Sequence, residues 1–551
     1  MSRSPAAAAL ASLTRLGRRY GPGLASRKLD LLAVLAHTRL ATAPQLKRLH
    51  ELLCFLHAYP DNRQLQTRVR RMLHAFRRRP DLRRHRAALA GSGIAGTDTP
   101  YRFFWPTAYW LSEQWPGALR LDREDAEQAQ ALVDALPQLL EPAQADLLRR
   151  LPKPTLDVLD RFRPRGLGDA DYVISLVSAM PGDDLTREAF FDRVDAPFVL
   201  RARPSTPERT TARLDFVRFQ PQRGPLRGPR PDLRRELRRR PRRIVELGAT
   251  RTRALIELAH GAMATRERDL AVFQFANPRD AFLVDDGAGL AFAMVGMLPE
   301  RRLLLPATYG GITLQNGVPI GYVQVDVLGR HAELSFNQFE TFRDGPAAHV
   351  FVRFVAMVRH VFRCDRFSIE PYQLGEGNDE AIDSGAWWFY RRFGFRPRDP
   401  AVMRVAAREE RRIALDPGYR SPRRVLTALA RRHLFYAIDS RAPISLPRTA
   451  AWLAAAARAL QSFPVKDAAD RRAAAMDAAR AWLAPGGRLA IDGRALSQWS
   501  GLVLALAHER DWTRRDRREL ARLIGAKYGR SERLYLRQVL RHARLRRMLD
   551  V

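Results

Sequence analysis

Apolar residues spaced three and four positions apart dominate the first part of the chain. Between residues 29 and 86 the segments LDLLAVLAHTRL, LKRLHELLCFLHAY and LQTRVRRMLHAFRRR repeat leucine, valine or phenylalanine at this spacing. A period of about 3.6 residues places such positions on one face of a helix. The pattern resumes over residues 122–151 after a looser aromatic stretch. It predicts a helical N-terminal domain over residues 1–150.

The middle of the chain changes to strand-like patterning. GLAFAMVGM is an apolar run typical of a buried strand, and HAELSFNQF alternates apolar and polar residues as a half-buried strand does. In YGGITLQNGVPIGYVQVDVLG, Asn316 and Gly317 separate two β-prone runs, which is a strong hairpin signal. The helical spacing of HVFVRFVAMVRHVFR and a short strand, RFSIEPY, follow. This order predicts an α/β domain over residues 246–400.

The regions on either side of this domain contain fewer candidate functional motifs. Residues 401–551 return to helical, very basic sequence, which predicts a helical C-terminal domain. Residues 151–245 are mixed and rich in proline and arginine, ending in QPQRGPLRGPRPDLRRELRRRPRRIVELG. Two interpretations of this last stretch stay open: a solvated connector, or an arm that binds nucleic acid.

Composition adds a strong positive charge. The chain carries 94 Lys and Arg against 59 Asp and Glu, a formal net charge of +35. Such an excess attracts polyanions, including nucleic acid, acidic lipid surfaces and phosphorylated cofactors. The arginines concentrate in three clusters, Arg68–Arg86, Arg234–Arg243 and Arg514–Arg547.

Cysteine usage and hydropathy bear on the compartment. The two cysteines, Cys54 and Cys364, are far apart in the sequence, which argues against a disulfide framework and fits a reducing compartment. No apolar run approaches the roughly 18 residues of a membrane span. The basic, alanine-rich N-terminus could imitate a targeting segment, but it continues directly into helical sequence. We therefore predict a cytoplasmic protein without a membrane span.

The turn FRDGPAA, residues 342–348, precedes the longest helical pattern of the α/β region. The first N–H groups of a helix have no partner within it, and the helix dipole adds positive potential there. Backbone N–H groups from Arg343 to Ala348 could therefore hold a pyrophosphate, with the Arg343 side chain as counter-charge. Pro346 contributes no N–H. No metal site is predicted, because His349 and His360 lack metal-ligand spacing.

These motifs together resemble the GNAT acyltransferase superfamily. Phe342 to Ala347 matches the Gly and Ala positions of its acyl-CoA-binding turn, Gln/Arg-x-x-Gly-x-Gly/Ala, but departs at the first, where Phe342 stands. A later motif, an Asn followed by Tyr-x-x-x-Gly-Phe, is matched by Asn378 and by Tyr390 to Phe395. The resemblance covers roughly residues 289–397. The segments NGVP, FRDG, EPYQLG and SGAWWFYRRFGFRP also resemble, in this order, a group of uncharacterised bacterial proteins, which implies no substrate.

The resemblance implies a GNAT-like mixed α/β sheet domain between mostly α-helical N- and C-terminal regions. It implies that Tyr390 protonates the departing CoA thiolate, and it allows Glu370, at a strand end, to act as general base. The alternatives that stay open are packing against the sheet for Tyr390 and an ion pair with an arginine for Glu370. A backbone amide near Ser335 to Asn337 would polarise the thioester carbonyl. The implied acyl-CoA contacts are Phe342, Arg343, Asp344, Gly345, Ala347, Ala348, Asn337 and Asn378.

The function expected from these motifs is acyl-CoA- or acetyl-CoA-dependent transfer of an acyl group to an amine. Two alternatives stay open. One is a basic nucleic-acid-binding protein whose GNAT-like fold is not catalytic. The other is a transferase that takes its acyl group from an aminoacyl-tRNA, which the basic surface would suit.

Overall fold

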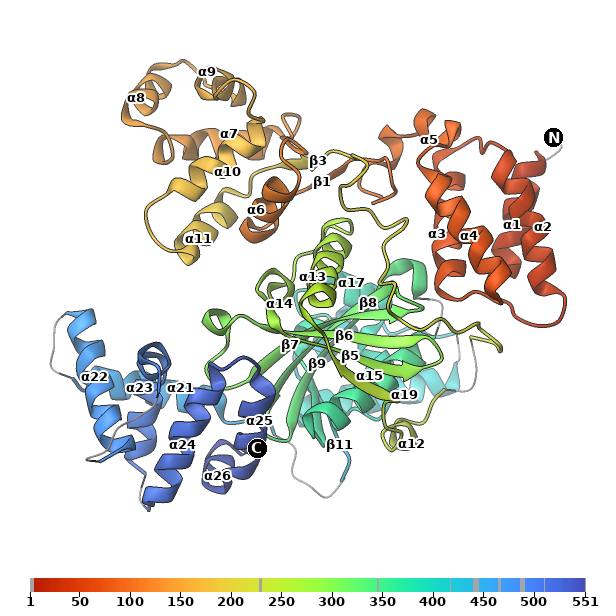
Figure 1. Cartoon of the computed structure of the whole chain (residues 1–551). Coiled ribbons are helices and arrows are strands. Elements are labelled where there is room, and N and C mark those ends of the chain that lie inside the picture. The colour runs from red at the N-terminus through yellow and green to blue at the C-terminus, as the bar shows by residue number, and fades with distance from the viewer. Residues whose placement is uncertain are drawn as a thin grey trace.

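The computed structural model describes residues 4–226, 230–343, 346–416, 418–439, 445–463, 467–485, 491–509 and 511–550. Three hydrophobic cores organise these residues. Two belong to helical units in the first part of the chain, and the largest joins a central sheet to the C-terminal helices (Figure 1). The structure confirms the mixed α/β class that the sequence predicts.

The first unit is a bundle of helices. Leucines at helical spacing turn inward, as the sequence predicts; Leu32, Leu46 and Leu65 are fully buried. Ser4, Thr42 and Asn62 accept hydrogen bonds from backbone N–H groups at helix starts, which caps them. The helices are α1 (Pro5–Leu16), α2 (Leu24–His37), α3 (Ala43–Ala58), α4 (Arg63–Phe76) and α5 (Pro80–Arg84).

The second unit has its own core, which runs across residue 150 to include Val173 and Phe198. A three-stranded sheet in the order β1-β3-β2 closes it. Its elements are β1 (Thr99–Tyr101), α6 (Trp105–Gln114), β2 (Leu119–Leu121), α7 (Ala126–Ala135), α8 (Pro142–Arg150), α9 (Leu159–Phe162), α10 (Asp169–Ala179), α11 (Asp184–Val194) and β3 (Phe198–Leu200).

The central domain is built on an eight-stranded sheet in the order β11-β10-β9-β8-β7-β6-β5-β4. All neighbours pair antiparallel except β9 and β10, which are parallel. The predicted hairpin is confirmed: Asn316 and Gly317 have φ of 52° and 83° and join β7 to β8. The strands are β4 (Arg243–Glu246), β5 (Ala276–Gly287), β6 (Leu290–Met297), β7 (Ala307–Gln315), β8 (Val318–Leu328), β9 (His331–Gln338), β10 (Arg366–Ile369) and β11 (Leu434–Ala437).

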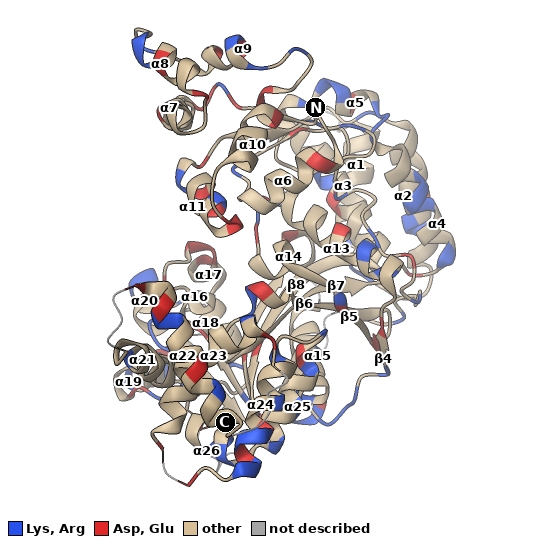
Figure 2. Cartoon of the chain, turned by 60° about the vertical axis from the view of Figure 1, so that its left-hand side comes forward, with Lys and Arg blue, Asp and Glu red and all other residues tan. Residues whose placement is uncertain are grey.

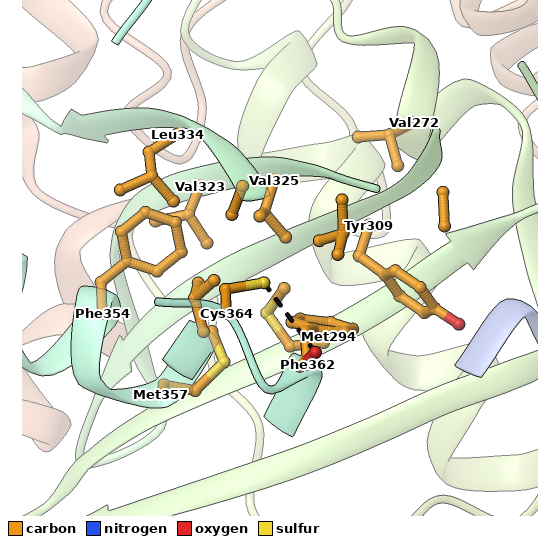
Figure 3. Close-up of a cluster of buried hydrophobic side chains, with 14 of the residues drawn as sticks. Val272, Met294, Tyr309, Val323, Val325, Leu334, Phe354, Met357, Phe362 and Cys364 are labelled. Atoms are coloured by element: carbon orange, nitrogen blue, oxygen red, sulfur yellow. Dashed lines mark hydrogen bonds between the residues drawn. The ribbon is translucent and has the colours of Figure 1, made fainter. Parts of the chain in front are cut away.

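Helices cover both faces of this sheet. On one face, α13 (Ala249–Ala264) contacts β5, and α14 (Ala271–Gln274) packs so closely that a Cβ on Gly310 would meet Val272 at 2.3 Å. On the other face lies α15 (Ala347–Phe362), which connects β9 to β10. Its apolar side packs on the sheet through Phe354 and Met357, and the buried thiol of Cys364 follows it (Figure 3).

The chain after β10 forms several short helices. The sequence predicts one helix, capped by Asn378 or Asp379 and running through Phe393, but Gly385 adopts φ of 67° and separates α17 (Asp379–Ser384) from α18 (Ala386–Arg391). A left-handed residue cannot continue an α-helix, and glycine adopts this conformation readily. The remaining helices of the domain are α16 (Pro371–Leu374), α19 (Pro400–Leu415) and α20 (Arg423–Ala430).

The arginine-rich stretch before β4 packs against α15. It contains α12 (Leu233–Glu236), and Leu233 and Leu237 are buried in the central core. The Leu237 carbonyl accepts hydrogen bonds from Arg359 at 3.0 Å and His360 at 3.1 Å, both on α15. This part of the predicted connector therefore belongs to the α/β domain.

The C-terminal helices dock on the sheet through a buried charged group. Lys527 and Glu532, both fully buried, form an ion pair at 2.5 Å, and Arg302 donates to the Lys527 carbonyl at 2.6 Å. The helices are α21 (Thr449–Gln461), α22 (Ala468–Leu483), α23 (Gly493–Ala507), α24 (Arg514–Lys527), α25 (Glu532–Arg541) and α26 (Ala543–Leu549). Within the described ranges, no helix has the length and hydropathy to cross a bilayer.

Candidate functional site

The parallel strands β9 and β10 separate before β9 ends. They pair only from His331 to Glu333 on β9, whereas β9 runs on to Gln338 along β8. The Phe339 N–H donates to the Ile320 carbonyl at 3.0 Å. Because backbone groups alternate sides along an antiparallel strand, the N–H groups of residues 336 and 338 point away from β8. They therefore face the opening between the two strands.

A cavity of about 240 Å³ lies at the end of β9, beside this opening. Three consecutive β9 residues line it, Phe336, Asn337 and Gln338. Successive side chains of a strand point to opposite faces of the sheet, so the cavity reaches both faces. The other lining residues come from the start of α15 and from the segment α16–α18, namely Arg343, Ala347, Gln373, Asn378, Glu380, Ala381, Ser384, Ala386, Phe389 and Tyr390.

Within the described part of the chain, two side-chain amides at this cavity have buried atoms without a hydrogen-bond partner. Gln338 is only 6% exposed, yet neither its Nε2 nor its Oε1 makes a hydrogen bond among the described residues. The Asn337 Oδ1 atom is also buried without a partner there. Most buried polar atoms in proteins are hydrogen-bonded, and leaving one unpaired costs roughly 1–3 kcal/mol. A polar ligand in the cavity would supply the missing bonds.

The N-terminus of α15 opens on the same cavity through Ala347. Pro346 occupies the capping position and makes no side-chain hydrogen bond, and the first turn holds no acidic residue. Val350 is the first residue of this helix whose N–H bonds back to Pro346. The N–H groups of residues 347–349 therefore have no capping side chain among the described residues. Asp344 and Gly345, two of the predicted contacts, lie outside them.

Arg343 and Glu380 line the cavity, and Arg268 contacts Glu380. Glu380 forms ion pairs with Arg343 and, at 2.5 Å, with Arg268. Burial raises the pKa of Glu380, but hydrogen bonds from the two arginines outweigh it and hold the pKa below its ordinary value. The Arg343 Nε also donates to the Gln338 carbonyl at 3.0 Å. The trio keeps one net positive charge beside the α15 N-terminus.

Tyr390 lines the cavity, is 3% exposed, and has its ring 5.3 Å from that of Phe351. Its hydroxyl makes no hydrogen bond with the described residues. Burial, and secondarily the charge of Glu370, raises its pKa above the ordinary value, so the hydroxyl stays protonated at neutral pH. Burial and the nearby charges of Glu333 and Asp326 likewise raise the pKa of Glu370.

The structure brings together part of the set predicted from the sequence. The cavity is lined by Tyr390, Arg343, Ala347, Asn337 and Asn378. Asn378 also caps α17, accepting from the Ala381 N–H at 3.1 Å, so its side chain has a structural task.

The other predicted residues do not line this cavity. Phe342 is 2% exposed and packs on the first helical unit, its ring 6.3 Å from Phe55 and 6.5 Å from Tyr59. Ala348 lines a separate cavity of about 530 Å³. Glu370 is near Tyr390 electrostatically but is not part of the cavity wall.

Sequence reasoning missed Gln338, and it named Glu380 only as a helix-capping charge or part of an acidic patch and Phe389 only as a packing residue. Phe389 stacks on Phe336 with rings 6.1 Å apart and 1° between their planes. The alternation in HAELSFNQF marked Gln338 as a strand residue facing the same way as Leu334 and Phe336, and a polar residue on that apolar face was the available signal.

Comparison with known proteins gives no relative. No protein-family model matches the chain, and neither the curated proteins nor the solved structures searched gave a match. The function must therefore be argued from the geometry of this site.

Proposed function

We propose that the chain is an acyl-CoA-dependent N-acyltransferase whose central domain is GNAT-like. The observation that carries the proposal is the cavity at the end of β9, because among the described residues it combines a helix N-terminus without a capping side chain with the unpaired amide of Gln338. The first suits a pyrophosphate, and the second suits the amide groups of a pantetheine arm. A cavity that reaches both faces also lets donor and acceptor approach from opposite sides.

Each group in the site has a separate role in the reaction. The N–H groups at the start of α15 and the net positive charge around Arg343 hold the diphosphate. The N–H of Phe336, directed into the opening, donates to the thioester carbonyl oxygen and stabilises the charge that develops there when the amine attacks. The carbon–sulfur bond then breaks, and Tyr390 gives its proton to the sulfur. Glu370 takes the proton of the attacking amine through a water, because it does not line the cavity.

Coenzyme A binding tests this assignment directly. Calorimetry should show that the wild-type protein binds CoA. In Ala347→Glu the affinity for CoA should fall about 100-fold, because the new carboxylate repels the diphosphate at the helix N-terminus. A carboxylate at a helix N-terminus interacts favourably with the helix dipole, so the variant should remain folded. Ala347→Gln, of equal size and no charge, is the matched control and should bind within a few-fold of wild type. No CoA binding to the wild type, or equal binding to the Glu variant, would refute the site.

The basic surface supports a second candidate, a transferase that uses aminoacyl-tRNA. Lysines and arginines gather along α2, α4 and α5 (Figure 2). The exposed Arg70, Arg71, Arg83 and Arg84 form no ion pairs within the described part of the chain. This reading predicts that tRNA binds, that its affinity falls steeply with salt, and that Ala347→Glu leaves it unchanged. Protein that binds CoA but no tRNA would exclude it.

A further inference from the structure

A second cavity lies beside the turn that leads into α15, and helices of the first unit form most of its wall. It has a volume of about 440 Å³, within the range of small-molecule sites. The turn contributes Glu340 and Thr341, whereas Arg343, two residues later, lines the first cavity. Thr341 and Arg343 are two residues apart at the 3₁₀ turn Glu340–Phe342, so the same short segment lines both cavities.

The first unit is fixed to this turn by several contacts. Arg18, in the turn after α1, donates to the Thr341 carbonyl at 3.3 Å, and the Thr341 hydroxyl donates to Glu51 on α3. The ring of Phe342 packs on Phe55, also on α3. These contacts give the second cavity a defined position relative to α15. They also explain why Phe342 is directed away from the first cavity.

The charges of this second cavity favour an anion. Lys47 and Arg48, both exposed on α3, line it and have no carboxylate partner among the described residues. The carboxylate of Glu51 is already held by Arg209 at 2.5 Å and by Thr341. Glu340 is exposed to solvent at the rim. Two cations thus remain available beside one solvated carboxylate.

The other residues of the wall suit the ring of a nucleobase. Leu52, Phe55 and Pro44 form the apolar part of the lining. A nucleoside bearing a phosphate needs such an apolar surface for its ring and cations for its phosphate. Coenzyme A has this part: beyond its diphosphate it carries an adenosine with a 3′-phosphate.

We infer that the N-terminal helical bundle forms part of the acyl-CoA site, and that Lys47 and Arg48 bind the 3′-phosphate of the adenosine. This inference rests on the proposed function. The diphosphate lies at the N-terminus of α15, the pantetheine arm enters the first cavity, and the adenosine lies over the turn in the second. The basic bundle then selects CoA thioesters over thioesters that lack the nucleotide.

Dephospho-CoA, which lacks only the 3′-phosphate, isolates this contact. In calorimetry the wild-type protein should bind CoA about tenfold more tightly than dephospho-CoA, the effect of one or two charge-assisted hydrogen bonds. In the double variant Lys47→Gln/Arg48→Gln this ratio should fall to about one through weaker binding of CoA, with the affinity for dephospho-CoA unchanged.

The matched control is Arg71→Gln/Arg78→Gln. It removes the same charge from exposed positions of the same bundle that do not line the cavity. It should keep the preference for CoA, and thermal melting should show that both double variants remain folded.

Equal binding of CoA and dephospho-CoA by the wild type would overturn the inference while leaving the proposed function intact. A preference lost equally in both double variants would also overturn it, by showing only long-range attraction. If neither ligand binds, the proposed function fails and this inference fails with it.

Discussion

Two polar groups enclosed by the central domain differ in how completely they are bonded. On α15, Arg353 is buried and its donors are all used: Asp286 accepts two bonds at 2.7 Å each, Glu236 accepts through its carbonyl and carboxylate, and the Arg239 carbonyl accepts a fifth at 3.0 Å. At the cavity, by contrast, the amide of Gln338 has no partner among the described residues.

The difference distinguishes a polar group that stabilises the fold from one that is available to a ligand. Completed bonds around Arg353 tie the arginine-rich stretch and β5 to α15, so this group holds the fold together. The amide of Gln338, unpaired within the described ranges, weakens the fold, because a buried polar group without a partner costs free energy. Such a cost is expected where a binding site is prepared for a ligand.

The largest effect should come from breaking the completed group. Arg353→Ala leaves Asp286 buried without its counter-charge and should destabilise the domain by about 3–5 kcal/mol. Thermal and urea unfolding would measure this. The double variant Arg353→Met/Asp286→Leu, which removes both charges, should recover most of the loss. An unchanged melting temperature in Arg353→Ala would show that the group contributes nothing to stability.

Removing the Tyr390 hydroxyl tests the cavity side of the comparison. Tyr390→Phe should lower the release of free thiol from acetyl-CoA in the presence of a primary amine by about 100-fold, the usual contribution of a general acid. The packing of the ring on Phe351 is kept, so affinity for CoA should change less than threefold. Tyr436→Phe, in a neighbouring ring cluster outside the cavity, is the control. Loss of affinity instead of turnover would make Tyr390 a packing residue.

Local sequence signals were enough to predict much of the fold. Asn316 and Gly317 predicted the hairpin because few residues accept positive φ at both turn positions. The apolar spacing from Val350 to Phe362 predicted α15, and alternation predicted β9. These signals depend on backbone conformation and on the burial of one face, which a short window of sequence records.

Long-range contacts account for what the sequence did not predict. The packing of the arginine-rich stretch on α15 depends on Arg353 and Arg359, more than a hundred residues away. Phe342 turns inward because α3 offers Phe55. The importance of Gln338 follows from the early end of β10, and no local pattern shows where a partner strand stops.

Exchanging the unpaired amide for an apolar group should separate binding from stability. Gln338→Leu should weaken CoA binding about tenfold while leaving stability unchanged or raised by about 1 kcal/mol, because an unpaired buried group is removed. Gln324 on β8 is the matched control, since its amide donates to Asp326 at 3.2 Å. Gln324→Leu should lower stability and leave CoA binding unchanged. If both variants lost stability equally, Gln338 would not be an unsatisfied group.

The smallest effect concerns Glu370 and pH. Burial, then the charges of Glu333 and Asp326, raises its pKa in the folded protein above the unfolded value of about 4.3. The folded state therefore holds this proton more tightly, so its contribution to stability is present below the unfolded pKa and is lost as pH rises through the folded pKa. The Glu370→Gln variant has no carboxyl group to titrate, so its stability does not fall in this way as pH rises. The variant should melt with the wild type near pH 4 and above it at pH 7; a variant that melts lower at pH 7 would mean that the charged carboxylate is stabilised by a partner.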